Sequence, residues 1–169
     1  TTGGLDTLDV EYIDSDGIPN VFMVRKSTLE HCGYFDEAIV QTYTEPDLAF
    51  LACRLGYKCA FVQDAETYHR IPEEKSAIQL GGNKFNQKAF FLMRNRTVIV
   101  ARYGNWFQQT VYFIFFSWAW PLIYSISVLK EHRYDLIRLY WRGYWCGLKF
   151  FFSLKLPDPE YIISQLIRD

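Results

Sequence analysis

The chain has 169 residues, which is enough for one domain with a buried core or for part of a larger one. Its formal net charge is -1, so the composition gives no argument for nucleic-acid binding, and we expect no nucleic-acid partner. The hydrophobic share of 50% and the aromatic share of 18% are high for a soluble domain, and the aromatic residues are concentrated after Phe85.

The cysteines and the start of the chain also bear on its class. The four cysteines contain no C-x-x-C pair, so we predict no zinc site, and scattered thiols fit a reduced, cytoplasmic protein. The sequence begins at Thr1 without a signal-like segment, and we interpret it as the C-terminal portion of a longer protein.

The first part of the chain combines turn signals with one short apolar run. Residues 1–20 are polar and contain Gly-Gly and Asp-Gly pairs, which predict a loop-rich connection. The apolar residues 21–24 predict a buried strand. Ser27-x-x-Glu30 matches a capping box, so a short helix is predicted there, and Gly33 can take the left-handed conformation that ends it.

A second helix is predicted to begin at Thr44, because Thr44-x-x-Asp47 repeats the capping-box pattern. Pro46 would lie in the first turn, where its missing N–H costs little. Gly56 is the predicted stop. The apolar face of this helix would consist of Leu48, Leu51, Ala52 and Leu55.

Two short strands and a long helix are predicted next. Residues 58–63 alternate in part and favour a strand, and residues 66–69 favour another. Pro72 interrupts the pattern, and a long helix follows over residues 76–103, weakened by a pair of glycines near its start.

The second half of the chain changes character, with no charged residue between Arg102 and Lys130. As a helix, residues 110–129 would span about 30 Å, the thickness of a bilayer core. A buried core helix is the alternative, but the preceding part is too small to cover all faces of this run. Basic residues flank both ends and favour the cytoplasmic side, so a re-entrant or interfacial helix bent at Pro121 fits better than a single crossing.

A basic, aromatic segment follows over residues 134–156. It interleaves arginine and lysine with leucine, tryptophan and phenylalanine, which is typical of an amphipathic helix on an anionic membrane surface. The best internal boundary in the sequence is near Tyr103 and Gly104.

Several motifs occur together before that boundary: Phe22-Met23-Val24-Arg25-Lys26, Gly33-Tyr34-Phe35-Asp36-Glu37, Glu45-x-Asp47-Leu48, Arg54-Leu55-Gly56-Tyr57, the strand to His69, and Arg94-Asn95-Arg96. In this order and spacing they resemble the C-terminal half of the catalytic domain of family-2 glycosyltransferases, which have the GT-A fold. The resemblance covers residues 20–103. It implies an α/β class, with the C-terminal, acceptor-side half of a GT-A (Rossmann-like) domain over residues 1–103. A membrane-associated region of hydrophobic and amphipathic helices would follow over residues 104–169.

The resemblance implies roles for residues near the second helix. Glu45 would be the general base that takes the proton of the acceptor hydroxyl, and Thr44 stands where a second acid is common. An acid in a first helical turn is otherwise worth about 0.3–1 kcal/mol against the helix dipole, which is the alternative for Glu45. Asp47 is assigned mainly to capping, and also to positioning the base or the acceptor. Phe35 and Asp36 would shape a turn beside the acceptor.

The resemblance also implies a divalent cation, Mg²⁺ or Mn²⁺, to offset the charge of the leaving diphosphate. His69 matches a histidine associated with the metal or diphosphate, and a structural histidine is the alternative. Arg94 and Arg96 would contact phosphate or lipid headgroups, or else belong to a solvated helix face. The nucleotide-binding half and its Asp-x-Asp motif would lie upstream, since Asp14-Ser15-Asp16 precedes the strand and is not assigned to metal.

These features together predict part of an inverting glycosyltransferase at the cytoplasmic face of a membrane, inactive as this chain alone. Its donor would be a nucleotide-sugar, and its acceptor a glycan or lipid-linked glycan of the cell envelope. The competing class is a non-catalytic membrane-binding module, in which the acidic pair only caps a helix and the basic aromatic tail recruits lipid or a partner.

Overall fold

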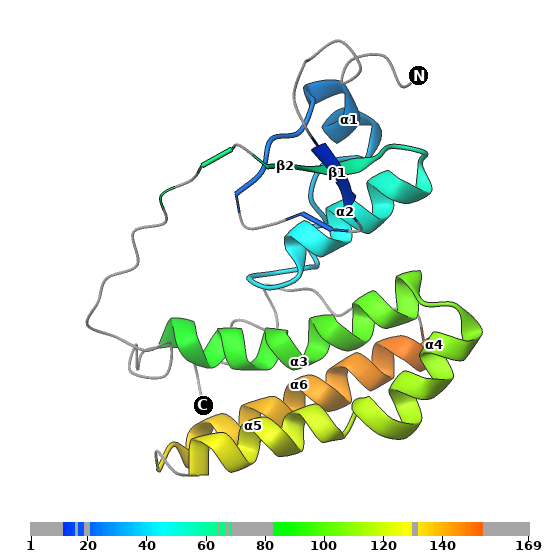
Figure 1. Cartoon of the computed structure of the whole chain (residues 1–169). Coiled ribbons are helices and arrows are strands. Elements are labelled where there is room, and N and C mark those ends of the chain that lie inside the picture. Colours follow the sequence, from blue (N-terminus) through cyan, green and yellow to red (C-terminus); the bar gives the residue numbers. More distant parts are fainter. Residues whose placement is uncertain are drawn as a thin grey trace. The chain divides into compact units, whose positions relative to one another are not determined.

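The computed structural model describes residues 12–15, 17–18, 21–63, 65–66, 68, 83–129 and 132–153. These residues are mostly helical, with one small two-stranded sheet (Figure 1). The chain divides into two compact units. Unit 1 comprises Thr1–Tyr34 and Glu45–Pro72, and unit 2 comprises Phe35–Thr44 and Glu73–Asp169.

Unit 1 holds two strands and two helices: β1 (Tyr12–Ser15), α1 (Lys26–His31), α2 (Thr44–Arg54) and β2 (Cys59–Val62). The strands pair antiparallel, with Ile13 opposite Phe61. The strand predicted over residues 58–63 is confirmed as β2, whereas β1 lies within residues 1–20, where only a loop was predicted. Its four residues, YIDS, carry little strand signal of their own, and the pairing comes from a segment far along the chain.

Two other strand predictions in unit 1 did not hold. Residues 21–24 form no strand, and the side chain of Met23 is 101% exposed, because no described strand pairs with this run. Of the strand predicted over residues 66–69, Glu66 and Tyr68 belong to no strand, and Thr67 and His69 lie outside the described residues.

Both helices of unit 1 end shortly before a glycine. Gly33 and Gly56 have φ of 75° and 87°, in the left-handed region that glycine enters without a Cβ penalty. After α2, the N–H of Tyr57 donates to the carbonyl of Ala52, and Gly56 donates to Cys53. The same pattern closes α1, so both helices end in a Schellman motif, as the glycines predicted.

The capping box predicted for α1 is wrong. The residue before the helix is Arg25, which makes no side-chain cap, so Ser27 lies inside the first turn. Glu30 instead approaches Lys26, with 3.7 Å between Nζ and Oε1. The second predicted helix does begin at Thr44 and ends at Arg54.

Unit 2 is built on helices: α3 (Asn83–Tyr103), α4 (Trp106–Val111), the π-helical turn η1 (Tyr112–Phe116), α5 (Ala119–Leu129) and α6 (Tyr134–Ser153). The long helix predicted over residues 76–103 is confirmed from Asn83, and residues 76–82 lie outside the described part. The helix is irregular before Pro121 and not at Pro121, where the bend was predicted. The irregularity is η1, where Ser117 N–H donates to the Tyr112 carbonyl five residues back, whereas Pro121 sits in the first turn of α5.

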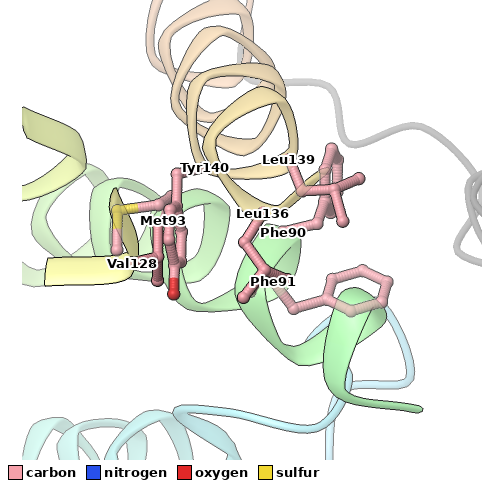
Figure 2. Close-up of a cluster of buried hydrophobic side chains, with 8 residues drawn as sticks. Phe90, Phe91, Met93, Val128, Leu136, Leu139 and Tyr140 are labelled. Atoms are coloured by element: carbon pink, nitrogen blue, oxygen red, sulfur yellow. The ribbon is translucent and has the colours of Figure 1, made fainter. Parts of the chain in front are cut away.

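The core of unit 2 lies between α3, α5 and α6. Figure 2 shows Phe90, Phe91 and Met93 of α3 together with Val128 of α5 and Leu136, Leu139 and Tyr140 of α6. Because α3 packs with α5 and α6 around this cluster, residues 83–103 belong with the helices that follow. The boundary expected near Tyr103 and Gly104 therefore does not match the division of the structure.

Two glycines of α6 set how closely it approaches α3. A Cβ at Gly143 would lie 2.2 Å from the Phe90 carbonyl oxygen, and a Cβ at Gly147 would lie 2.8 Å from Thr97 Cβ. These positions form a Gly-x-x-x-Gly pattern, the spacing that lets two helix backbones meet. The buried face of the predicted amphipathic helix is thus used for packing on α3, and only its opposite face is left for a membrane surface.

Gly143→Ala should force α3 and α6 apart, because the new methyl group would overlap backbone that cannot yield. We expect a loss of about 1–3 kcal/mol in the free energy of unfolding. Gly17→Ala is the matched control, since a Cβ there meets nothing within 4 Å. Denaturant unfolding of both variants measures this, and equal stabilities would contradict the close approach.

Candidate functional site

The acidic pair lies in the first turn of α2. Glu45 is half-buried, and Asp47 is only 4% exposed, next to the buried Leu48 and Ala49. Both acids lie near the positive end of the helix dipole. A single helix start therefore presents a partly accessible carboxylate beside a buried one. Their roles as base and as positioning residue stay predictions.

The segment Phe35–Thr44, which we call the anchored segment, leads directly into α2 and belongs to unit 2. At its start, Asp36 accepts a hydrogen bond from the Ala38 N–H at 2.8 Å through Oδ1. Its Oδ2 lies 2.6 Å from Nη2 of Arg102 on α3. Asp36 therefore shapes a turn, as predicted, and ties that turn to a helix. Phe35 is exposed, and its place beside an acceptor stays a prediction.

Buried polar side chains of α3 hold the middle of the anchored segment. Asn95 is fully buried and donates through Nδ2 to the carbonyls of Val40 at 3.0 Å and Thr42 at 2.8 Å. Arg94 is also fully buried. It donates through Nη2 to the Ala38 carbonyl and through Nε to Asn95 Oδ1. Burial lowers the pKa of Arg94 to about 10, against opposing effects of Cys146 and Asp36, so the guanidinium stays charged at pH 7.

Arg96 holds the end of the same segment. Its Nε donates to the Tyr43 hydroxyl at 2.7 Å, and its guanidinium lies 4.0 Å from the ring centre of Trp120 on α5. Arg94 is thus not on a solvated helix face, and Arg96 is half-buried. Nη1 of each arginine is buried without a hydrogen-bond partner in the described part of the chain. Binding of phosphate or lipid headgroups by these residues stays a prediction.

The backbone of the anchored segment is strained at two positions. Gln41 and Tyr43 have φ of 64° and 66°, a region that side chains with a Cβ rarely adopt. Nothing in the sequence around them signals this, since neither is glycine or asparagine. The sequence marks Arg94-Asn95-Arg96 as a motif, but nothing in it reveals that the partners of this motif are carbonyls and the Tyr43 hydroxyl of the anchored segment.

The predicted metal site is not assembled within the described residues. No group of three or more histidine, cysteine, aspartate or glutamate side chains there could hold a metal ion, and His69 lies outside them. Asp14, the first acid of the unassigned Asp14-Ser15-Asp16, lies 3.4 Å from Lys58 Nζ. The cation and the role of His69 therefore stay predictions.

Two thiols lie close together in unit 1. Cys53 and Cys59 have their Sγ atoms 3.8 Å apart. Burial, together with the hydrogen bond and charge of Cys53, raises the pKa of Cys59 to about 11. A thiol with that pKa is protonated at pH 7, so Cys59 is a poor nucleophile and metal ligand.

Comparison with protein-family models, with curated proteins and with solved structures gives no significant match to this chain.

Asp47→Asn should cost about 1 kcal/mol of unfolding free energy, because a buried charge at the start of α2 loses its interaction with the helix dipole. Glu30→Gln is the control. It removes an exposed acid whose pair with Lys26 contributes little at the surface. Denaturant unfolding at pH 7 compares the two, and a larger loss for the control would exclude a stabilising role for Asp47.

Proposed function

We propose that this chain is the acceptor-side part of an inverting glycosyltransferase that uses a nucleotide-sugar donor. In such a transfer the acceptor hydroxyl attacks the anomeric carbon in line, the bond to the nucleoside diphosphate breaks, and a carboxylate accepts the hydroxyl proton. The observation that carries the proposal is the placement of Glu45. This half-buried carboxylate follows directly on a segment held by buried hydrogen bonds. A general base acts efficiently only when its carboxylate is held in a fixed position relative to the reacting hydroxyl.

The exposed apolar surface of unit 1 supports a missing donor-binding half. Ile13 and Phe61, paired across the two strands, are both more than half exposed, and Met23 is fully exposed. A two-stranded ribbon is marginally stable by itself. We propose that an upstream nucleotide-binding half of the GT-A fold covers this surface and supplies the Asp-x-Asp site. That site, with His69, would bind Mg²⁺ or Mn²⁺.

The helical stretch Trp106–Leu129 supports attachment to a membrane. It is the one helix in the described part long and apolar enough to cross a bilayer, and only 28% of its apolar window is buried. A core helix of a soluble protein would be mostly buried. Its exposed side chains form an apolar face that includes Phe107, Ile114, Phe115, Trp118, Leu122, Ile126 and Leu129. Lipid is the partner that such a face fits.

The outward face of α6 adds a basic, aromatic surface. Arg138, Trp145, Lys149 and Phe152 are exposed and recur at spacings of seven, four and three residues, which places them on one side of the helix. Such a surface is attracted to anionic headgroups. We place the protein at the cytoplasmic face of the membrane, where a lipid-linked glycan acceptor would be within reach.

A non-catalytic membrane-binding module is the second candidate. The same exposed apolar face favours it. In that case the two acids would only stabilise the start of α2. The two candidate functions differ in one testable respect: only the glycosyltransferase needs Glu45 for turnover.

Glu45→Gln keeps the shape of the side chain but cannot accept a proton. In the protein with its donor-binding half, turnover should fall by about 10²–10⁴, with the affinity for the donor nearly unchanged. Release of nucleoside diphosphate measures turnover, and Glu30→Gln, on α1, is the control. Near-normal turnover of Glu45→Gln would remove Glu45 from the mechanism.

Leu122→Lys combined with Ile126→Lys should weaken binding to vesicles containing anionic lipid by at least about tenfold. Each substitution removes an exposed apolar side chain that lipid would cover and adds a charge to the apolar face. Met23→Lys, at a fully exposed position of unit 1, is the control. Vesicle flotation measures the effect, and unchanged flotation of the double variant would exclude this face from lipid contact.

A further inference from the structure

We infer that Asn95 and Arg96 of α3 are positioning residues that hold the strained end of the anchored segment, the backbone that leads into the first turn of α2. This inference rests on the proposed function. The resemblance gave Asn95 no role beyond its place in a motif and implied that Arg96 contacts phosphate or lipid headgroups. Holding the turn is a different role for both side chains.

The strain is centred on Gln41. The N–H of Thr42 donates to the Val40 carbonyl at 2.8 Å, two residues back, which closes a three-residue turn around Gln41. With φ of 64° at Gln41, this is the strained form of the γ-turn, which is rare in proteins. Tyr43 adds a second left-handed residue directly before α2. Strained backbone of this kind persists only where its surroundings determine it, and it is concentrated at functional sites.

Asn95 supplies the contact that determines the turn. Its Nδ2 donates to the carbonyls on both sides of Gln41, those of Val40 and Thr42, so one amide group spans the turn. Asn95 is fully buried, and Arg94 Nε donates to its Oδ1, which fixes the orientation of the amide. An extended backbone at Gln41 would move these two carbonyls apart and leave buried polar groups unpaired.

Arg96 holds the next strained residue. Its Nε donates to the Tyr43 hydroxyl, while its guanidinium stacks on Trp120 of α5. Both left-handed residues are therefore connected to α3, one through main-chain carbonyls and one through a side chain. Ile39, which is 2% exposed and packs with Val98 and Phe150, anchors the segment on the near side of the turn.

The chain offers a matched pair of substitutions at Gln41. Gln41→Gly and Gln41→Val both remove the exposed hydrogen bond from Gln41 Nε2 to Gln87 Oε1. They differ in the backbone that they favour. Glycine adopts φ of 64° without penalty, whereas a β-branched residue strongly opposes it. A purely local role for the Gln41 side chain would make the two variants behave alike.

The test uses the protein with its donor-binding half and measures nucleoside diphosphate release from UDP-, GDP- and dTDP-linked hexoses, well below the unfolding temperature. For Gln41→Val we expect kcat to fall by about tenfold or more with the KM for the donor unchanged, because the turn that leads into the helix of the acid is lost while the donor site is intact. Gln41→Gly should keep kcat within about threefold of the unchanged protein. Equal kcat values for the two variants would overturn the inference.

A second measurement separates this inference from the proposed function. Amide hydrogen exchange of residues 38–43 in the same proteins needs no substrate. Gln41→Val should exchange faster than Gln41→Gly by about tenfold or more, because the hydrogen bonds from Asn95 no longer fit. If no donor is turned over by the unchanged protein, the proposed function fails. Equal exchange in the two variants would overturn the inference that Asn95 holds the turn around Gln41.

Discussion

Two buried polar side chains on α3 hold the anchored segment within the helical unit. Arg94 and Asn95 are fully buried on α3, and a buried donor left without a partner costs about 1–3 kcal/mol. The carbonyls of the anchored segment, more than fifty residues earlier in the chain, accept hydrogen bonds from Nη2 of Arg94 and Nδ2 of Asn95. The segment therefore belongs to the helical unit although the chain on either side of it does not.

Helices α5 and α6 of unit 2 pack with α3. Gly143 and Gly147 let α6 approach α3 closely, and the apolar cluster joins α5 to both helices. Arg96 then connects α5, through Trp120, to the end of the anchored segment. The same α5 carries exposed apolar side chains on its other face. In our account one helical unit thus serves two purposes: it contacts lipid, and it positions the segment that leads to Glu45.

Local signals in the sequence predicted the elements whose ends are decided locally. Gly33 and Gly56 gave the ends of α1 and α2, and periodicity gave the long helices. The Gly-x-x-x-Gly pattern at Gly143 also predicts a close approach of α6 to another helix, although it does not say which one. The strands failed because β1 depends on a distant partner and residues 21–24 have none in the described part. The strained turn at Gln41 could not be predicted, because hydrogen bonds from Asn95, far away in the sequence, impose it on a residue that does not favour it.

The most direct test of this account compares the two neighbouring tryptophans of the apolar stretch in a bilayer. Trp118 is exposed on the apolar face, whereas Trp120 is half-buried against Arg96. In variants that keep only one of them, with phenylalanine at the other tryptophan positions, brominated lipids should quench Trp118 fluorescence strongly and Trp120 fluorescence weakly. Equal quenching of both, or quenching of neither, would contradict a helix with one face to lipid and the other packed against Arg96 of α3.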